Sequence, residues 1–378
     1  MKQKWWILLT LLLCGCGASS QPDQTGAVQN DRPRLSASTE ETAENVAAVE
    51  KNENLEKNPS NSNQNPGEGQ NWTVFAMDTV MQFDAYGGSA NLQEKVKWRV
   101  EELEGELSTT QENSDIFHLN QEKTAELSAD TRYLMQEALA LGAETDGALD
   151  ISIYPIVRSW GFTTGNYRVP SENERESLLK SVDYRLVGLG ADMASIEPGM
   201  MVDLGGVGKG FTGDEVVKAM KEDGVTSALF SLGGNIQTIG TKPDGEKWSV
   251  GIKDPESDGY LGGVGVQDEA VITSGGYERY FTDNDGTIYW HIMDPSTGTP
   301  AHSGLISVTI IGPCGLRCDG LSTALFVMGR EKAAAHWTAH QDYEAVLVDE
   351  RGTIWLTPGL KDRFIPVDQG ETREIRIL

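Results

Sequence analysis

The chain of 378 residues has few basic residues, few cysteines and few prolines. Lysine and arginine total 31 against 57 aspartates and glutamates, so the formal net charge is -26. A chain this acidic repels phosphate backbones, which excludes nucleic-acid binding as its main task. The four cysteines and 14 prolines exclude a disulfide-rich scaffold and a collagen-like repeat. A hydrophobic fraction of 38% still suffices for a sizeable core, which excludes disorder over the whole chain.

The apolar run near the N-terminus is too short to cross a bilayer as a helix. Lys2 and Lys4 precede this run at residues 5–13, as in an export signal. The next residues, Leu13-Cys14-Gly15-Cys16, resemble a bacterial lipobox. We therefore predict a signal peptide at residues 1–15, lipidation of Cys16 and a position on the extracytoplasmic face of a bacterial cell membrane. An ordinary secretory signal with incidental cysteines is the alternative.

Residues 16–71 are rich in Ser, Asn, Gln and Glu and contain almost no apolar clusters. Such a segment cannot bury enough apolar surface to order itself, so we interpret it as a tether. The folded domain is predicted at residues 72–378. Within it, Cys314 and Cys318 are compatible with a local disulfide or with two free thiols, and two cysteines alone do not make a zinc site.

Strand and helix patterns alternate irregularly in the domain, which predicts a mixed α+β fold. Helical spacing of apolar residues is clearest at residues 92–107 and 131–145, and a shorter helix is expected at residues 172–181. Strand patterns occupy residues 73–86 and 200–204, and the last third of the chain alternates strands with turns. No internal repeat is visible.

A glycine-rich segment at residues 203–210 precedes an expected helix at residues 211–223. Such a helix start can bind an anion, and Lys209 adds a full positive charge. The spacing matches neither the Rossmann fingerprint nor the P-loop. A tight turn with an exposed lysine would explain the segment equally well.

Two further groups of polar residues are candidates for chemistry. Asp319, Ser322 and Thr323 share one face of an expected helix that opens at Leu321 and continues toward His340. Their oxygen atoms suit Mg²⁺, although Asp319 could instead be a simple N-cap. His291 lies between a strand pattern and the turn at residues 294–298, where a structural role is also possible.

The order of these motifs resembles the FAD:protein FMN transferase family, also called the ApbE family. The matching stretches are Met77-Asp78-Thr79, Leu107-Ser108-Thr109, residues 145–150, Trp160-Gly161-Phe162, residues 203–210, Leu232-Gly233-Gly234, Thr273-Ser274-Gly275, residues 291–298 and residues 319–323.

This resemblance implies an α+β fold of two lobes, with a β-rich core, surrounding helices and a cleft between the lobes for FAD. It also implies transfer of the FMN moiety of FAD to a threonine hydroxyl of an acceptor flavoprotein, with Mg²⁺ as cofactor and AMP as the second product. The acceptor would carry a short threonine flavinylation motif. Two alternatives use the same residues: hydrolysis of FAD to FMN and AMP, and a lipid-anchored protein that binds FAD without turnover.

By the same resemblance His291 is the general base, because a threonine hydroxyl benefits from a base of near-neutral pKa. Mg²⁺ would be held by Asp319, Ser322, Thr323 and the carbonyl of Gly206. The residues implied for FAD binding are Met77, Thr110, Ala148, Leu149, Asp150, Asp203, Lys209 and Met293.

The chain departs from the usual family pattern at three positions. Asp78 replaces a common glycine and could repel a phosphate, Thr110 replaces a frequent aromatic residue, and Cys318 stands where alanine is frequent.

Overall fold

The computed structural model describes residues 69–367 and 373–378. The predicted signal peptide, Cys16 and the tether up to residue 68 lie outside this part of the chain. Strand β1 (Gly69–Ala76) begins three residues before the domain start that the sequence predicts at Trp72. No helix in the described ranges combines the length and the apolar character needed to cross a membrane.

The largest element is a nine-stranded sheet with the order β1-β2-β6-β7-β10-β15-β16-β17-β19. Its neighbouring strands are antiparallel except for β17 and β19, which are parallel. The strands after β1 are β2 (Thr79–Gly87), β6 (Val225–Leu232), β7 (Asn235–Ile239), β10 (Ala270–Gly275), β15 (Leu305–Gly312), β16 (Glu344–Asp349), β17 (Ile354–Leu356) and β19 (Ile375–Ile377).

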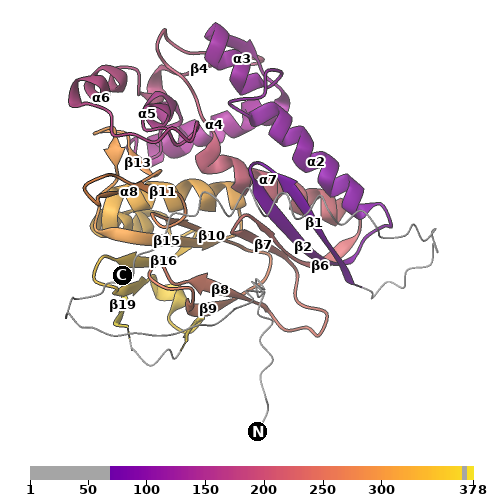
Figure 1. The fold of residues 1–378 in the computed structure, drawn as a ribbon. Coiled ribbons are helices and arrows are strands. Elements are labelled where there is room, and N and C mark those ends of the chain that lie inside the picture. Colours follow the sequence, from indigo (N-terminus) through magenta and orange to yellow (C-terminus); the bar gives the residue numbers. More distant parts are fainter. Residues whose placement is uncertain (1–68, 368–372) are drawn as a thin grey trace, which may run out of the picture. The chain divides into compact units, whose positions relative to one another are not determined.

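Three long helices cover one face of this sheet (Figure 1). Helix α2 (Leu92–Leu107) packs with α7 (Gly205–Glu222) over β1, β2 and β6, and α8 (Gly315–His340) packs over β10 and β15. The opposite face of the β10 to β16 region carries a small sheet of β8 (Trp248–Lys253), β9 (Tyr260–Val266) and β18 (Phe364–Pro366).

The core follows the two-residue period of the strands. In β10, Ile272 belongs to the cluster beneath the helices, whereas its neighbour Val271 belongs to the cluster against the small sheet. Ile310 and Ile311 of β15 divide between the two faces in the same way. The central strands are therefore buried on both faces, which explains why they appear in the sequence as continuous apolar runs.

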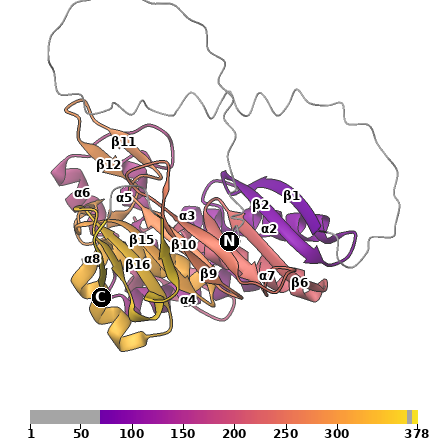
Figure 2. The ribbon, with the colours of Figure 1, turned by 90° about the horizontal axis from the view of Figure 1, so that it is seen from below.

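The remaining elements lie around the ends of this sheet, and Figure 2 shows β11 and β12 beyond α5 and α6. They are α3 (Asp115–Glu122), β3 (Thr124–Glu126), α4 (Ala129–Glu144), η1 (Ile151–Ile153), α5 (Tyr154–Ser159), α6 (Glu172–Leu179), η2 (Tyr184–Leu186), β4 (Gly188–Leu189), β5 (Met193–Ser195), β11 (Tyr280–Thr282), β12 (Ile288–Trp290), β13 (Met293–Asp294), β14 (Thr299–Pro300) and η3 (Pro358–Leu360).

The three helices predicted at residues 92–107, 131–145 and 172–181 are present in the structure. Helix α2 has the predicted bounds, and α4 and α6 are shifted by one or two residues at their ends. The strand pattern at residues 73–86 is a hairpin of β1 and β2, because Met77 and Asp78 both adopt positive φ, at 51° and 57°. These angles form the tight turn that hairpin strands require.

Three sequence predictions are wrong: those for residues 200–204, for the start of α7 and for the start of α8. Residues 200–204 form no strand, because their backbone groups bind loops and side chains: the Val202 N–H donates to Asn120 Oδ1 at 2.6 Å, and the Asp203 N–H donates to Ile151 O at 2.9 Å. Helix α7 starts at Gly205 rather than at Phe211, so the glycine-rich segment is its first turn. Helix α8 starts at Gly315, which places Asp319 inside the helix and excludes an N-cap role there.

Helix α8 reaches His340, as the sequence suggests, but it is interrupted on the way. Gly329 has φ 77° and ψ 167°, which no helix accommodates, so a second helical segment follows it.

Candidate active site

The first turn of α7 forms one wall of the candidate site. The Asp203 carboxylate accepts a hydrogen bond from the Gly205 N–H at 2.9 Å and so caps the helix from two residues upstream. Burial raises the pKa of Asp203, while the nearby charges of Arg279 and Lys209 oppose this shift.

The glycines of α7 have two different roles. A β-carbon on Gly210 would lie 2.2 Å from the Gly315 carbonyl oxygen of α8, so this glycine permits close contact between the two helices. A β-carbon on Gly208 would meet nothing within 4 Å, and one on Gly206 would meet nothing nearer than Leu149 Cδ1 at 3.5 Å. Space therefore remains beside the first turn of α7 at Gly206 and Gly208, whereas Gly210 is packed tightly against α8.

Asp319 links α8 to α7 at this contact. Its Oδ2 accepts a hydrogen bond from the Gly210 N–H at 2.8 Å, and the residue is only 5% exposed. Burial raises the pKa of Asp319, opposed by the charge of Lys209 and by the Gly210 hydrogen bond.

Three hydroxyl groups gather one turn further along α8. Ser274 Oγ at the end of β10 lies 2.7 Å from Ser322 Oγ and 3.3 Å from Thr323 Oγ1. Ser322 also donates to the Asp319 carbonyl at 2.8 Å. With the Asp319 carboxylate these groups make an all-oxygen set on one side of α8, which is the chemistry that Mg²⁺ prefers.

Lys209 stands at the electrostatic centre of the site. Its positive charge opposes the burial that raises the pKa values of Asp203, Glu278 and Asp319, and it adds to the burial that lowers the pKa of His291, so these four groups lie within electrostatic range of one ammonium group although they are far apart in sequence. Within the part of the chain that the structure describes, Lys209 has no hydrogen-bond or ion-pair partner. A half-buried cation without a partner is suited to an anionic ligand.

His291 follows β12 and is held by the backbone of Arg279. Its N–H donates to the Arg279 carbonyl at 3.0 Å, and Nδ1 lies 3.2 Å from the same oxygen. Because a carbonyl can only accept, Nδ1 carries the proton in this arrangement and Nε2 has the free lone pair. Burial, assisted by the charge of Arg279, lowers the pKa of His291 to about 4. This value is well below the near-neutral pKa expected from the sequence, because the half-buried ring lies beside two cations.

Two motif segments meet beside His291. The Trp160 indole N–H donates to the Gly298 carbonyl at 2.9 Å, and the Arg279 guanidinium donates to the Phe162 carbonyl at 2.7 Å. Trp160-Gly161-Phe162 therefore supports the turn that follows His291.

The remaining predicted residues lie on several elements. Met77, in the β1–β2 turn, contacts α7 through its sulfur, which is 3.6 Å from Thr212 Oγ1. Thr110 is exposed in the loop after α2. Ala148 is half-buried, and Leu149 approaches Gly206. Met293 is buried in a small apolar cluster with Trp160.

The Asp150 carboxylate accepts hydrogen bonds from backbone N–H groups of the protein. Its Oδ1 accepts from the Ser152 N–H at 2.8 Å, and its Oδ2 accepts from the Tyr184 N–H at 3.0 Å. In this arrangement the carboxylate shapes the loop that carries Leu149.

Sequence reasoning assigned no role to Ser274, Glu278 or Arg279, which the structure places in the site. Glu278 reaches solvent, yet the crowded protein atoms around its carboxyl raise its pKa to about 7. The available signal was a buried strand that leads into Ser274-Gly275-Gly276, followed after Tyr277 by two charged residues.

The two described cysteines form no disulfide. Cys318 is buried and Cys314 is half-buried, with its sulfur 3.5 Å from Asp214 Oδ2. Burial and the Asp214 charge raise the pKa of Cys314 to about 11, so it is a structural thiol.

Comparisons with known proteins all lead to one protein family. The model of the ApbE family matches residues 77–347. An FAD:protein FMN transferase of Treponema pallidum is 32% identical over 296 residues, which is 73% of this chain and 82% of that protein. An FAD:protein FMN transferase of Escherichia coli K12 is 30% identical over 316 residues, covering 79% and 88% of the two chains.

Solved structures agree with this result. The ApbE protein of Thermotoga maritima superposes with a TM-score of 0.74 and 31% identity, covering 78% of this chain and 99% of that one. The flavin transferase ApbE of Vibrio cholerae gives a TM-score of 0.72 at 27% identity, covering 79% and 100% of the two chains.

Proposed function

Since the chain belongs to the ApbE family and is an FAD:protein FMN transferase, which transfers FMN from FAD to target proteins, we propose that this transfer takes place between the first turn of α7, residues 319–323 of α8 and the end of β12. One observation carries the assignment: the unpaired Lys209 is the charge around which Asp203, Glu278, His291 and Asp319 converge. This cation would bind the pyrophosphate of FAD, within the cleft between two lobes that the family fold implies.

The oxygen set on α8 supports Mg²⁺ as the cofactor. Asp319, Ser322, Thr323 and the Gly206 carbonyl would hold the ion, and Ser274 would orient the two hydroxyls. The fit is good because a β-carbon built on Gly206 would lie 3.9 Å from Thr323 Oγ1, so the two residues face each other. When bound, Mg²⁺ neutralises charge on the transferring phosphoryl group.

For FAD itself we propose a binding site next to the first turn of α7. The open first turn of α7 would accept the phosphates, and the apolar residues would contact the flavin and adenine rings. The proposed lining residues are Met77, Thr110, Ala148, Leu149, Asp150, Asp203, Lys209 and Met293.

His291 would act as the general base through Nε2. The acceptor threonine oxygen attacks the phosphorus of the FMN half, a new phosphoester bond forms, and the bond from that phosphorus to the bridging oxygen breaks. AMP leaves with that oxygen, and the threonine proton passes to Nε2. The anionic FAD would raise the pKa of His291 from its low value by offsetting the charges of Arg279 and Lys209.

The experiment incubates the protein with FAD, Mg²⁺ and an acceptor flavoprotein that carries the threonine motif. Mass spectrometry should find one FMN added to the acceptor, with one AMP released per FMN. Free FMN and AMP without modified acceptor would indicate hydrolysis, and FAD retained without AMP would indicate binding only. Chelation of Mg²⁺ should abolish transfer.

We also propose lipid attachment at Cys16 and a position on the extracytoplasmic face of a bacterial membrane. The support is the lipobox-like run that precedes a polar tether. A Cys16→Ala variant expressed in the native host should leave the membrane fraction, and retention there would contradict the proposal.

A further inference from the structure

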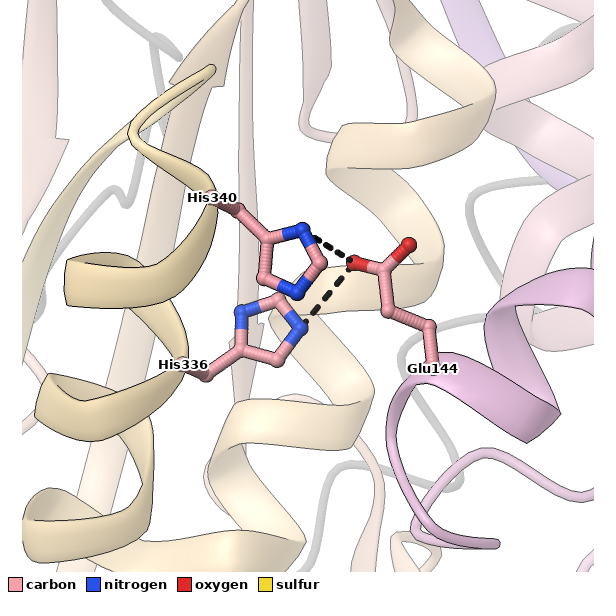
Figure 3. A group of neighbouring side chains, drawn as sticks. All are labelled: Glu144, His336 and His340. Carbon is pink, nitrogen blue, oxygen red and sulfur yellow. Dashed lines mark ion pairs between the residues drawn. The ribbon is translucent and has the colours of Figure 1, made fainter.

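A second group of ligand-type side chains lies on α4 and the end of α8. Glu144 is the last residue of α4, and His336 and His340 follow each other by one turn on the segment of α8 beyond Gly329. Figure 3 shows both rings directed at the same carboxylate. Glu144 Oε1 lies 3.0 Å from His336 Nε2 and 3.6 Å from His340 Nδ1.

These separations fit a tetrahedral metal site. Bonds of about 2.0–2.1 Å from a zinc ion to nitrogen and oxygen place neighbouring ligands about 3.3 Å apart. The two distances to Glu144 Oε1, 3.0 and 3.6 Å, lie on either side of this value, and one ligand atom from each residue lies within 4.8 Å of the others.

The surroundings of His336 also match those of a metal ligand. The residue is only 7% exposed, and its Nε2 is buried without a hydrogen bond, because the nearby Glu144 oxygen is poorly aligned with the ring N–H direction. Nδ1 lies 2.8 Å from the Tyr343 hydroxyl. If Nδ1–H donates to that hydroxyl, the Nε2 lone pair points beside the Glu144 oxygen and not directly at it, which leaves a position between the two atoms for an ion.

The main objection is a positive charge next to the group. Arg317 donates to both Glu144 oxygens, at 2.7 and 2.9 Å. Arg317 Nε also lies 2.8 Å from Asp342 Oδ2, so two carboxylates face one guanidinium. With neutral histidines the formal charge of the cluster is -1, which favours a cation, and Arg317 fixes the carboxylate as an outer hydrogen-bond partner.

We propose that Glu144, His336 and His340 bind one divalent metal ion of the zinc class, with solvent in the fourth position. The donor set of two imidazoles and one carboxylate selects such an ion over Mg²⁺, which the oxygen set around Asp319 would take. His340 is 34% exposed at the side chain, which opens a route for the ion from solvent. The bound metal links α4 to α8 immediately before residues 145–150, and this site is independent of the proposed catalytic one.

The test titrates Zn²⁺ alone into the full chain at pH 7.5 with Mg²⁺ in excess, using calorimetry or a chromophoric chelator as competitor. One ion per chain is expected. His340→Gln should weaken binding at least about tenfold, and this variant removes little packing because His340 is partly exposed. His336→Gln should act likewise, with circular dichroism as a check on folding.

His118→Gln is the matched control, because His118 faces Glu122 one turn away at 3.7 Å without a third ligand. The affinity of the His118→Gln variant for Zn²⁺ should equal that of the parent chain. X-ray absorption of the zinc complex should show a first shell of nitrogen and oxygen with imidazole scattering. Absence of stoichiometric binding, unchanged affinity in His340→Gln, or a sulfur ligand would overturn the proposal and leave the group as an ion-pair network.

Discussion

The Asp319 carboxylate accepts a hydrogen bond from the Gly210 N–H, 2.8 Å away in the neighbouring helix. This contact joins the glycine-rich motif to the acidic motif across 109 positions of sequence. It also holds the Asp319 carboxylate in a fixed orientation against α7. The two motifs that the sequence suggests separately are therefore parts of one site.

Asp319→Asn tests the charge at this contact. The amide oxygen still accepts from Gly210, but the negative charge that we propose binds Mg²⁺ is lost, so we expect FMN transfer to fall at least about 100-fold at fixed Mg²⁺. The readout is in-gel flavin fluorescence of the acceptor. Asp244→Asn is the control, since Asp244 also accepts from a backbone N–H but is exposed and remote in sequence from the site. Full activity of Asp319→Asn would exclude a metal role for the carboxylate.

Arg279→Gln tests the low pKa of His291. The neighbouring guanidinium favours the neutral ring, so its removal should raise this pKa above about 4. With the neutral ring as the proposed base, kcat/KM for transfer in the parent, which reports the free enzyme, should stay constant above this pKa and decline as the pH falls through it. The variant should begin to decline at a higher pH.

Imidazole proton NMR against pH, with His291→Gln for assignment, measures this shift directly. Arg185→Gln, a change at a highly exposed arginine, should leave the His291 titration unchanged. An unchanged titration in Arg279→Gln would refute the electrostatic explanation.

Asp214→Ala tests the start of α8. The Asp214 carboxylate accepts from the Gly315 N–H at 2.7 Å and from the Leu316 N–H at 2.8 Å, and so satisfies two donors at the helix N-terminus. We expect the free energy of unfolding to fall by about 2 kcal/mol, measured by urea denaturation. Asp214→Asn should lose less, because its amide oxygen can still accept. Equal stability of Asp214→Ala and the parent chain would contradict this role.

Asp78→Gly and Asp78→Asn separate charge from backbone strain in the β1–β2 turn. Asp78 has φ 57°, which glycine and asparagine both tolerate. If the Asp78 carboxylate repels the FAD phosphates, both variants should lower KM for FAD by a similar factor. If only the backbone matters, Asp78→Gly alone should change KM. Steady-state transfer at varied FAD distinguishes the two, and no change in either would remove Asp78 from the binding argument.

The sequence by itself determined the helices whose apolar residues recur at helical spacing. The buried residues of α2, namely Leu92, Val96, Val100, Leu103 and Leu107, follow a period that local physics fixes without knowledge of the partner surface. The order of the motifs was also sufficient to indicate the family, because each motif carries its residue types within a short stretch.

Only the tertiary structure decided where the helices of the site begin and what their polar residues contact. Glycines at 205–210 suggest a loop locally, yet packing against α8 makes them helical, and the close approach at Gly210 requires the absence of a side chain. The contacts of Ser274 and Arg279 depend on strands and loops remote in sequence. The pKa of His291 depends on a cation twelve residues away, because electrostatic interactions follow distance in space and not along the chain.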